Sequence, residues 1–76
     1  MKGYRYDEEL YKKEFSSNLQ RVLNDKNVSQ RKLSEDTGIT EVSISRYLNG
    51  KRIPSFYTIE KIALALKCST DEFRCF

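Results

Sequence analysis

The chain carries few residues suited to covalent chemistry and many suited to hydrogen bonding with another molecule. Its 76 residues include no His and only two Cys. The chain therefore lacks the His base of the usual nucleophile–base pairs and the four Cys or His ligands of a typical zinc site. The residues whose types and spacing suggest a binding site lie between positions 29 and 52. They are Ser29, Gln30, Thr40, Glu41, Val42, Ser43, Ser45, Arg46, Asn49, Lys51 and Arg52. Such side chains contact phosphates and base edges, so we expect double-stranded DNA as the partner, no enzymatic activity, no cofactor and no metal.

Three of these residues suit the reading of bases. Arg46 can donate two hydrogen bonds to guanine or hold a phosphate, and Val42 can contact the methyl group of thymine. Glu41 can accept a hydrogen bond from the amino group of cytosine, or it can act only as a negative charge at the positive end of a helix. The sequence leaves both interpretations of Glu41 open.

The remaining residues suit the DNA backbone. Gln30 can donate its amide to a phosphate, and Lys51 and Arg52 follow in a loop that can bind phosphates. Ser45 and Asn49 can contact the DNA backbone as well, although Asn49 also fits the end of a helix.

Two short helices are predicted to position these residues. Ser29 can cap the first helix, whose inner face would be Leu33 and Thr37, and Gly38 tolerates the positive φ needed where the helix ends. Two such helices joined by a short turn containing Gly form a helix-turn-helix.

The second helix of this pair would carry the base-reading residues. Thr40 can cap it, Ile44, Tyr47 and Leu48 fall on one side, and Asn49-Gly50 can end it. Thr40 and Ser43 would lie at its N-terminal end. The opposite, outward side would then carry Val42, Ser45, Arg46 and Asn49.

These positions resemble the Cro/repressor-type helix-turn-helix family, also called the xenobiotic-response-element (XRE) family. The resemblance covers about Phe15 to Phe73 and includes Gln30, Leu33, Gly38, Ile39, Ile44, Asn49-Gly50 and the run from Lys51 to Ser55. It implies an all-α, compact five-helix DNA-binding domain that reads the major groove with the helix at about 40–49. Ser34 stands where the family usually has Ala.

The flanking segments are predicted to complete the domain. One helix can run from about Asp7 to Lys26, or it can break near Ser16-Ser17-Asn18, so we divide the chain into an N-terminal extension at 1–14 and a helix-turn-helix domain at 15–76. Ser69 and Glu72 form the spacing of a capping box for a last short helix. A helix beginning after Ser55 would bury one face, made of Phe56, Ile59, Ile62, Ala63 and Leu66.

The positive charge of the chain is concentrated on this region. The net charge is +3, and the segment from Lys26 to Arg52 has six Lys or Arg against three Asp or Glu, whereas the rest of the chain balances. A local excess of cations is typical of a phosphate-binding surface. There is no long apolar run and no signal-peptide pattern, so we expect a cytoplasmic protein without membrane contact.

The sequence therefore predicts a small, sequence-specific transcriptional regulator, of the repressor kind. The alternative is an antitoxin or adaptor of the same fold, which would bind another protein through its N-terminal extension. One recognition helix spans only a few base pairs, so we expect a homodimer, at least on DNA. Its contact surface would be either the end at 73–76 or the extension, which contains Tyr4, Tyr6, Leu10 and Tyr11.

Overall fold

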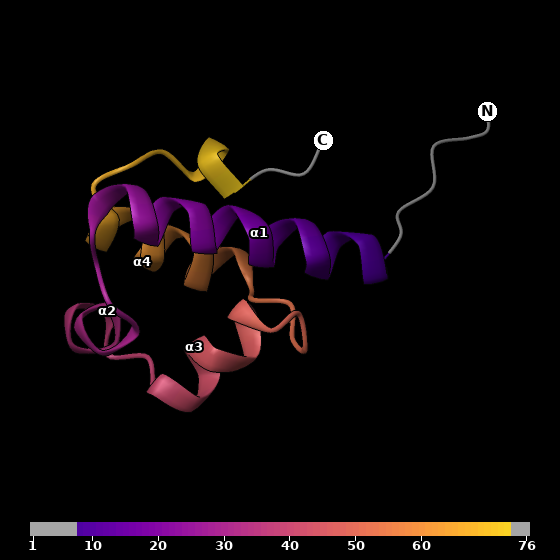
Figure 1. Ribbon diagram of the computed structural model, residues 1–76, viewed down its shortest axis with the longest axis horizontal. Helices are drawn as coiled ribbons and strands as arrows, with labels where there is room; N and C mark the ends of the chain where they lie inside the picture. The colour runs from indigo at the N-terminus through magenta and orange to yellow at the C-terminus, as the bar shows by residue number, and fades with distance from the viewer. Residues whose placement is uncertain (1–7, 74–76) are drawn as a thin grey trace.

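The computed structural model describes residues 8–73, and this part of the chain consists of helices and the loops that join them (Figure 1). The elements are α1 (Glu8–Lys26), α2 (Gln30–Thr37), α3 (Glu41–Leu48), α4 (Phe56–Leu66) and a terminal 3₁₀ helix, η1 (Thr70–Phe73). The all-α, five-helix prediction is confirmed, with the last helix in the tighter 3₁₀ form. None of the helices within this range is long and apolar enough to cross a membrane.

Helix α1 runs without a break through Ser16-Ser17-Asn18, as in the first of the two alternatives. It ends at Asn27, whose φ of 57° reverses the chain. The N–H of Val28 then donates to the carbonyl of Leu23 at 2.9 Å, and the N–H of Asn27 donates to Asn24 at 3.1 Å. These two bonds form the Schellman motif that satisfies the last carbonyls of a helix.

One hydrophobic core joins all four α-helices. Each helix contributes a side chain with no exposed surface, namely Leu19, Leu33, Ile44 and Ile62. The ring of Phe15 connects α1 to the rest of the core, because its centroid lies 6.2 Å from that of Tyr47 in a T-shaped contact and 5.6 Å from that of Phe73.

The long helix α1 organises the arrangement of the others. Figure 1 shows α1 crossing the domain with α4 behind it, and with α2 and α3 on its lower side. Helix α1 packs against α3 and η1, while α2 packs against both α3 and α4. Helix α3 therefore lies at the outer edge of the domain, and its inner side packs against α1 and α2.

The structure corrects two expectations about the flanks. Phe56 is 67% exposed rather than buried, because a helical side chain leans toward the N-terminus and Phe56 is the first residue of α4. Glu72 does not complete a capping box: its carboxylate pairs with Arg21 at 3.4 Å. Ser69 still caps η1, because its hydroxyl accepts the N–H of Asp71 at 3.1 Å.

The candidate dimer surfaces are only partly visible. Leu10 is 40% exposed, whereas Phe73 is 2% exposed and belongs to the core. Tyr4, Tyr6 and residues 74–76 lie outside the described part of the chain.

Gly38 is the residue on which the end of α2 depends. Its φ is 80°, and its N–H donates to the carbonyl of Ser34 at 2.8 Å. A Cβ at this position would meet no atom within 4 Å. Any penalty for a side chain here is therefore conformational and not steric.

This geometry gives a prediction for Gly38. We expect Gly38→Ala to lower the free energy of unfolding by about 1 kcal/mol, the order of the cost of left-handed backbone for an L-residue. Gly38→Asn should lose less, because Asn tolerates that conformation. Urea unfolding of the three proteins measures the difference, and equal stability of the Gly and Ala forms would contradict the assignment.

Candidate nucleic-acid interface

Side-chain caps begin both helices of the helix-turn-helix. Ser29 is extended, with ψ 164°, and its hydroxyl accepts the N–H of Lys32 at 3.0 Å. Thr40 plays the same role for α3, where its hydroxyl accepts the N–H of Ser43 at 3.2 Å. Both caps predicted from the sequence are therefore present, and each satisfies an N–H group that its helix leaves free.

The turn between α2 and α3 is held by two hydroxyl groups of α2. Ser34 donates to the carbonyl of Ile39, and Thr37 accepts the N–H of Ile39 at 3.1 Å while donating to the carbonyl of Leu33 at 2.7 Å. Both backbone groups of Ile39 are thus satisfied by side chains. Thr37 was predicted only as part of an inner face, and the sequence analysis missed the role of Ser34 entirely.

A complete set of hydrogen bonds ends α3. The N–H of Lys51 donates to Arg46 at 2.8 Å and that of Gly50 to Tyr47 at 3.2 Å, while the N–H of Asn49 donates to Ser45 at 3.0 Å. Gly50 has a φ of 68°, so this is a Schellman motif with Gly at the left-handed position. The prediction that Asn49-Gly50 ends the helix is confirmed.

The carbonyl of Leu48 is bound from another helix. The hydroxyl of Ser16, in the middle of α1, donates to it across 32 positions of sequence. Helix α1 also passes close to the next residue, since a Cβ on Gly50 would lie 3.8 Å from the carbonyl oxygen of Lys12. The first half of α1 therefore supports the end of α3, a role that the sequence analysis did not identify.

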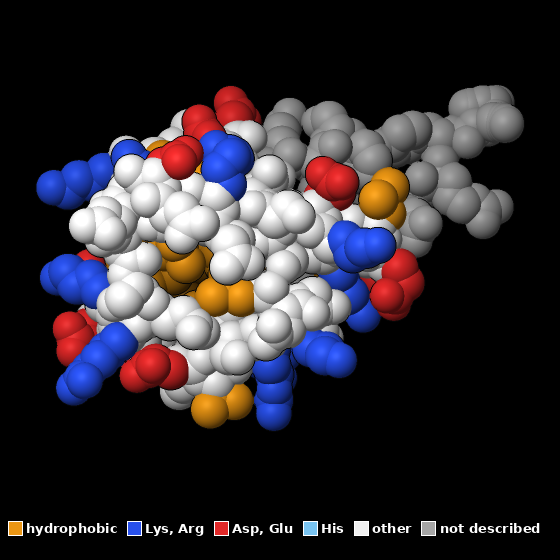
Figure 2. Space-filling view, in the orientation of Figure 1, with side chains coloured by type: hydrophobic (Ala, Val, Ile, Leu, Met, Phe, Trp, Pro, Cys, Tyr) orange, Lys and Arg blue, Asp and Glu red, His pale blue; other side chains and the backbone are white. Residues whose placement is uncertain are grey.

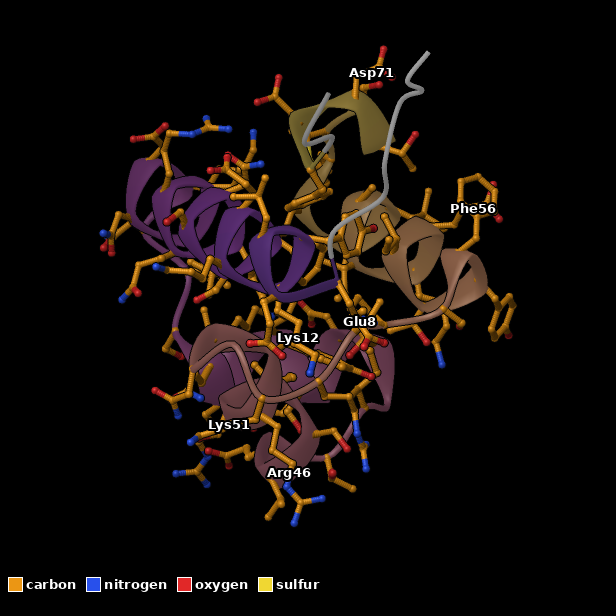
Figure 3. The ribbon with its side chains drawn as sticks, turned by 90° about the vertical axis from the view of Figure 1, so that its right-hand side faces the viewer. Glu8, Lys12, Arg46, Lys51, Phe56 and Asp71 are labelled. Atoms are coloured by element: carbon orange, nitrogen blue, oxygen red, sulfur yellow. The ribbon has the colours of Figure 1, made fainter. Side chains whose placement is uncertain are left out.

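The two sides of α3 differ as predicted. On the inner side Ile44 is 0% exposed and Tyr47 is 6% exposed, whereas Val42 on the outer side is 60% exposed. Figure 3 shows the Arg46 side chain projecting from the lower end of the domain, away from α1 and α4. A shallow depression on this surface is lined by Gln30, Glu41, Val42, Ser45 and Arg46.

Five of the eleven predicted residues thus meet in one depression, which combines α3 with the first residue of α2. The other six do not line it. Exposed side chains among them are Ser29, Thr40, Asn49, Lys51 and Arg52, and Ser43 is half-buried.

Several of these residues already have internal partners. The amide of Asn49 donates to the carbonyl of Ser45 at 2.9 Å and to its hydroxyl at 3.3 Å. The hydroxyl of Thr40 lies 3.1 Å from that of Ser43. Their side chains are therefore oriented by the protein itself. Among the residues that line the depression, Glu41, Val42 and Arg46 are exposed and Gln30 is half-buried.

The cations of the region fall into two groups. On α2, Arg31 lies 3.6 Å from Glu35 and Lys32 lies 3.1 Å from Asp36, so both are partly neutralised. Within residues 8–73, no carboxylate forms an ion pair with Arg46, Lys51 or Arg52. Figure 2 shows Lys and Arg side chains projecting from the lower edge, where α3 and the loop after it lie. These unpaired cations give the surface a positive potential suited to phosphates.

A second depression, on the other side of the domain, lacks the features of a reactive site. It is lined by Arg21, Val22, Asp25, Lys26, Cys68 and Glu72. Burial raises the pKa of the Cys68 thiol, so it stays protonated at neutral pH and is a poor nucleophile.

Comparison with known proteins points to the same region. The chain matches the helix-turn-helix family over residues 19–73, which is more than half of its length. No curated protein matches it at a significant level.

The hydroxyl of Ser34 gives a test of how the turn is held. Ser34→Ala should lower the free energy of unfolding by about 1 kcal/mol, because the carbonyl of Ile39 loses its partner in a half-buried place. Ser17→Ala is the matched control, since Ser17 is exposed on α1 and should change stability by less than about 0.5 kcal/mol. Equal effects in thermal or urea unfolding would show that the Ser34 bond does not stabilise the turn.

Proposed function

This chain belongs to the XRE-type helix-turn-helix family of DNA-binding proteins, and we propose that it is a sequence-specific transcriptional repressor that reads the major groove with α3. The observation that carries the proposal is the outward side of α3. It presents Arg46 without an ion-pair partner in the described chain, beside the exposed side chains of Val42 and Glu41.

The dimensions of α3 suit this role. An α-helix with its side chains is about 10–12 Å in diameter, which fits the major groove of about 12 Å width, and the eight residues of α3 extend about 12 Å along its axis. The side chains on its outward face are short apart from Arg46 and Glu41, so the helix can approach the base edges closely. Arg46 can then donate both of its terminal N–H groups to guanine, and Val42 can contact a thymine methyl group.

Residues around α3 would fix its position on the duplex. Gln30 is the first residue of α2, whose first turn contains no acidic residue, so its amide and the free N–H groups of the helix end can bind one phosphate. Lys51 and Arg52 lie beyond the other end of α3 and can bind a second phosphate. Contacts on both sides would hold α3 in the groove.

Glu41 can serve two roles in this proposal. It is the first residue of α3 and is exposed, so its charge suits the helix N-terminus as well as a cytosine amino group. Dimerisation on DNA is also part of the proposal, because two copies of α3 on an inverted repeat would read enough base pairs for specificity.

Selection from randomised duplexes is the direct test. Purified protein at near-physiological salt should enrich an inverted repeat with half-sites about one helical turn apart. If no sequence is enriched and the weak binding disappears as salt rises, attraction to phosphates accounts for the affinity. That outcome would contradict base reading and would favour the antitoxin or adaptor alternative.

Two substitutions separate base reading from phosphate binding. Arg46→Ala should cost about 1–3 kcal/mol of binding free energy on the selected site and little on a shuffled duplex. Lys51→Ala should weaken binding to both duplexes about equally and reduce the slope of log K against log salt by about 1. Titration by fluorescence anisotropy at several salt concentrations measures both, and an Arg46→Ala protein that keeps its affinity and preference would remove Arg46 from the reading residues.

A further inference from the structure

Residues 48–51 form a short arch between the end of α3 and the first half of α1, and we call this segment the arch. Its first carbonyl, that of Leu48, accepts the hydroxyl of Ser16. Its third residue, Gly50, has a positive φ of 68° and would place a Cβ 3.8 Å from the carbonyl oxygen of Lys12. Ser16 and Lys12 are one turn apart on α1, so this helix bonds to the arch at one point and passes close to it at the next.

The bond from Ser16 supplies a donor to a helix-end carbonyl that the N–H groups of residues 49–51 do not bind. The backbone N–H groups of residues 49–51 serve the carbonyls of Ser45, Tyr47 and Arg46. Leu48 is the last residue of α3, and its carbonyl accepts a hydrogen bond from the hydroxyl of Ser16. A helix end that turns away from water needs such a partner, and here it comes from a different helix.

The last residue of the arch, Lys51, is a cation of the proposed DNA surface. The N–H of Lys51 donates to Arg46 at 2.8 Å, which fixes the backbone of Lys51 relative to α3, while its side chain is exposed and free of ion pairs within residues 8–73. Figure 3 shows the Lys51 side chain on the same lower end of the domain as that of Arg46.

We propose that Ser16 is a positioning residue for DNA binding: through the carbonyl of Leu48 it holds the arch so that Lys51 meets a phosphate while Arg46 faces the bases. Ser16 is half-buried under the arch, and its hydroxyl is directed to the carbonyl of Leu48. It also lies before residue 19, where the match to the family begins, so this support is contributed by a part of the chain that the family comparison does not cover.

The test compares Ser16→Ala with Lys51→Ala, alone and combined, on two duplexes of about 30 base pairs, one carrying the selected site and one shuffled. One phosphate contact changes the salt slope by about 0.9, which corresponds to roughly fivefold in affinity near 0.15 M salt. We expect Ser16→Ala to weaken binding about three- to fivefold and to make the slope shallower. In the Lys51→Ala background it should have almost no further effect, because the contact that it positions is already gone.

Controls separate positioning from a general loss of folding. Ser17→Ala, one residue away and exposed, should leave affinity and slope unchanged, and Ser16→Thr should keep the slope because it retains the hydroxyl. Circular dichroism at the titration temperature selects conditions in which every variant is folded. A merely structural Ser16 would lower the midpoint of unfolding and leave the salt slope intact.

The inference rests on the proposed DNA binding, and the two can fail separately. If the wild type shows no preference between the duplexes, the proposed base reading is wrong. If the wild type prefers the selected site and Lys51→Ala lowers the slope, but folded Ser16→Ala binds like the wild type or adds its full effect to that of Lys51→Ala, the positioning role is wrong.

Discussion

An eight-residue helix does not hold its shape alone in water, and this constraint governs the structure around α3. The helix exists because its inner side chains, Ile44 and Tyr47, are buried against α1 and α2. The T-shaped contact between Phe15 and Tyr47 and the bond from Ser16 to Leu48 tie its second half to α1. Its outer side is thereby freed from any role in packing, so the residues there can be chosen for what they bind.

The sequence predicted well those features that local chemistry decides. The caps at Ser29 and Thr40 and the helix ends at Gly38 and Gly50 each depend on a few consecutive residues, and the structure has all of them. The spacing of the hydrophobic residues also distinguished the inner from the outer side of α3, because this spacing is a local property of the helix. Where φ is positive or a hydroxyl precedes a helix, the residue type itself carries the information.

The features that the sequence did not predict are contacts between residues far apart in the sequence and the burial of residues at the ends of helices. The partner of Ser16 lies 32 positions away, and no spacing rule connects a serine in a helix with a distant carbonyl. Phe56 fitted the inner stripe of α4 but lies beyond the edge of the core, because periodicity describes the middle of a helix and not its first residue. Ser34 was noted only as a replacement for Ala and Thr37 only as part of an inner face, although their hydroxyl groups hold the turn.

The internal hydrogen bonds also narrow the set of residues that can carry specificity. The capping hydroxyl groups of Ser29 and Thr40 already accept a backbone N–H of their own helix, and the amide of Asn49 already donates to the carbonyl of Ser45. These groups can still lie against a phosphate, but they can reorient toward a base only by giving up a bond that shapes the helix. Base discrimination in the proposed complex therefore falls first on Val42 and Arg46, whose side chains take part in no ion pair within residues 8–73, while the charge of Glu41 also suits the N-terminus of α3.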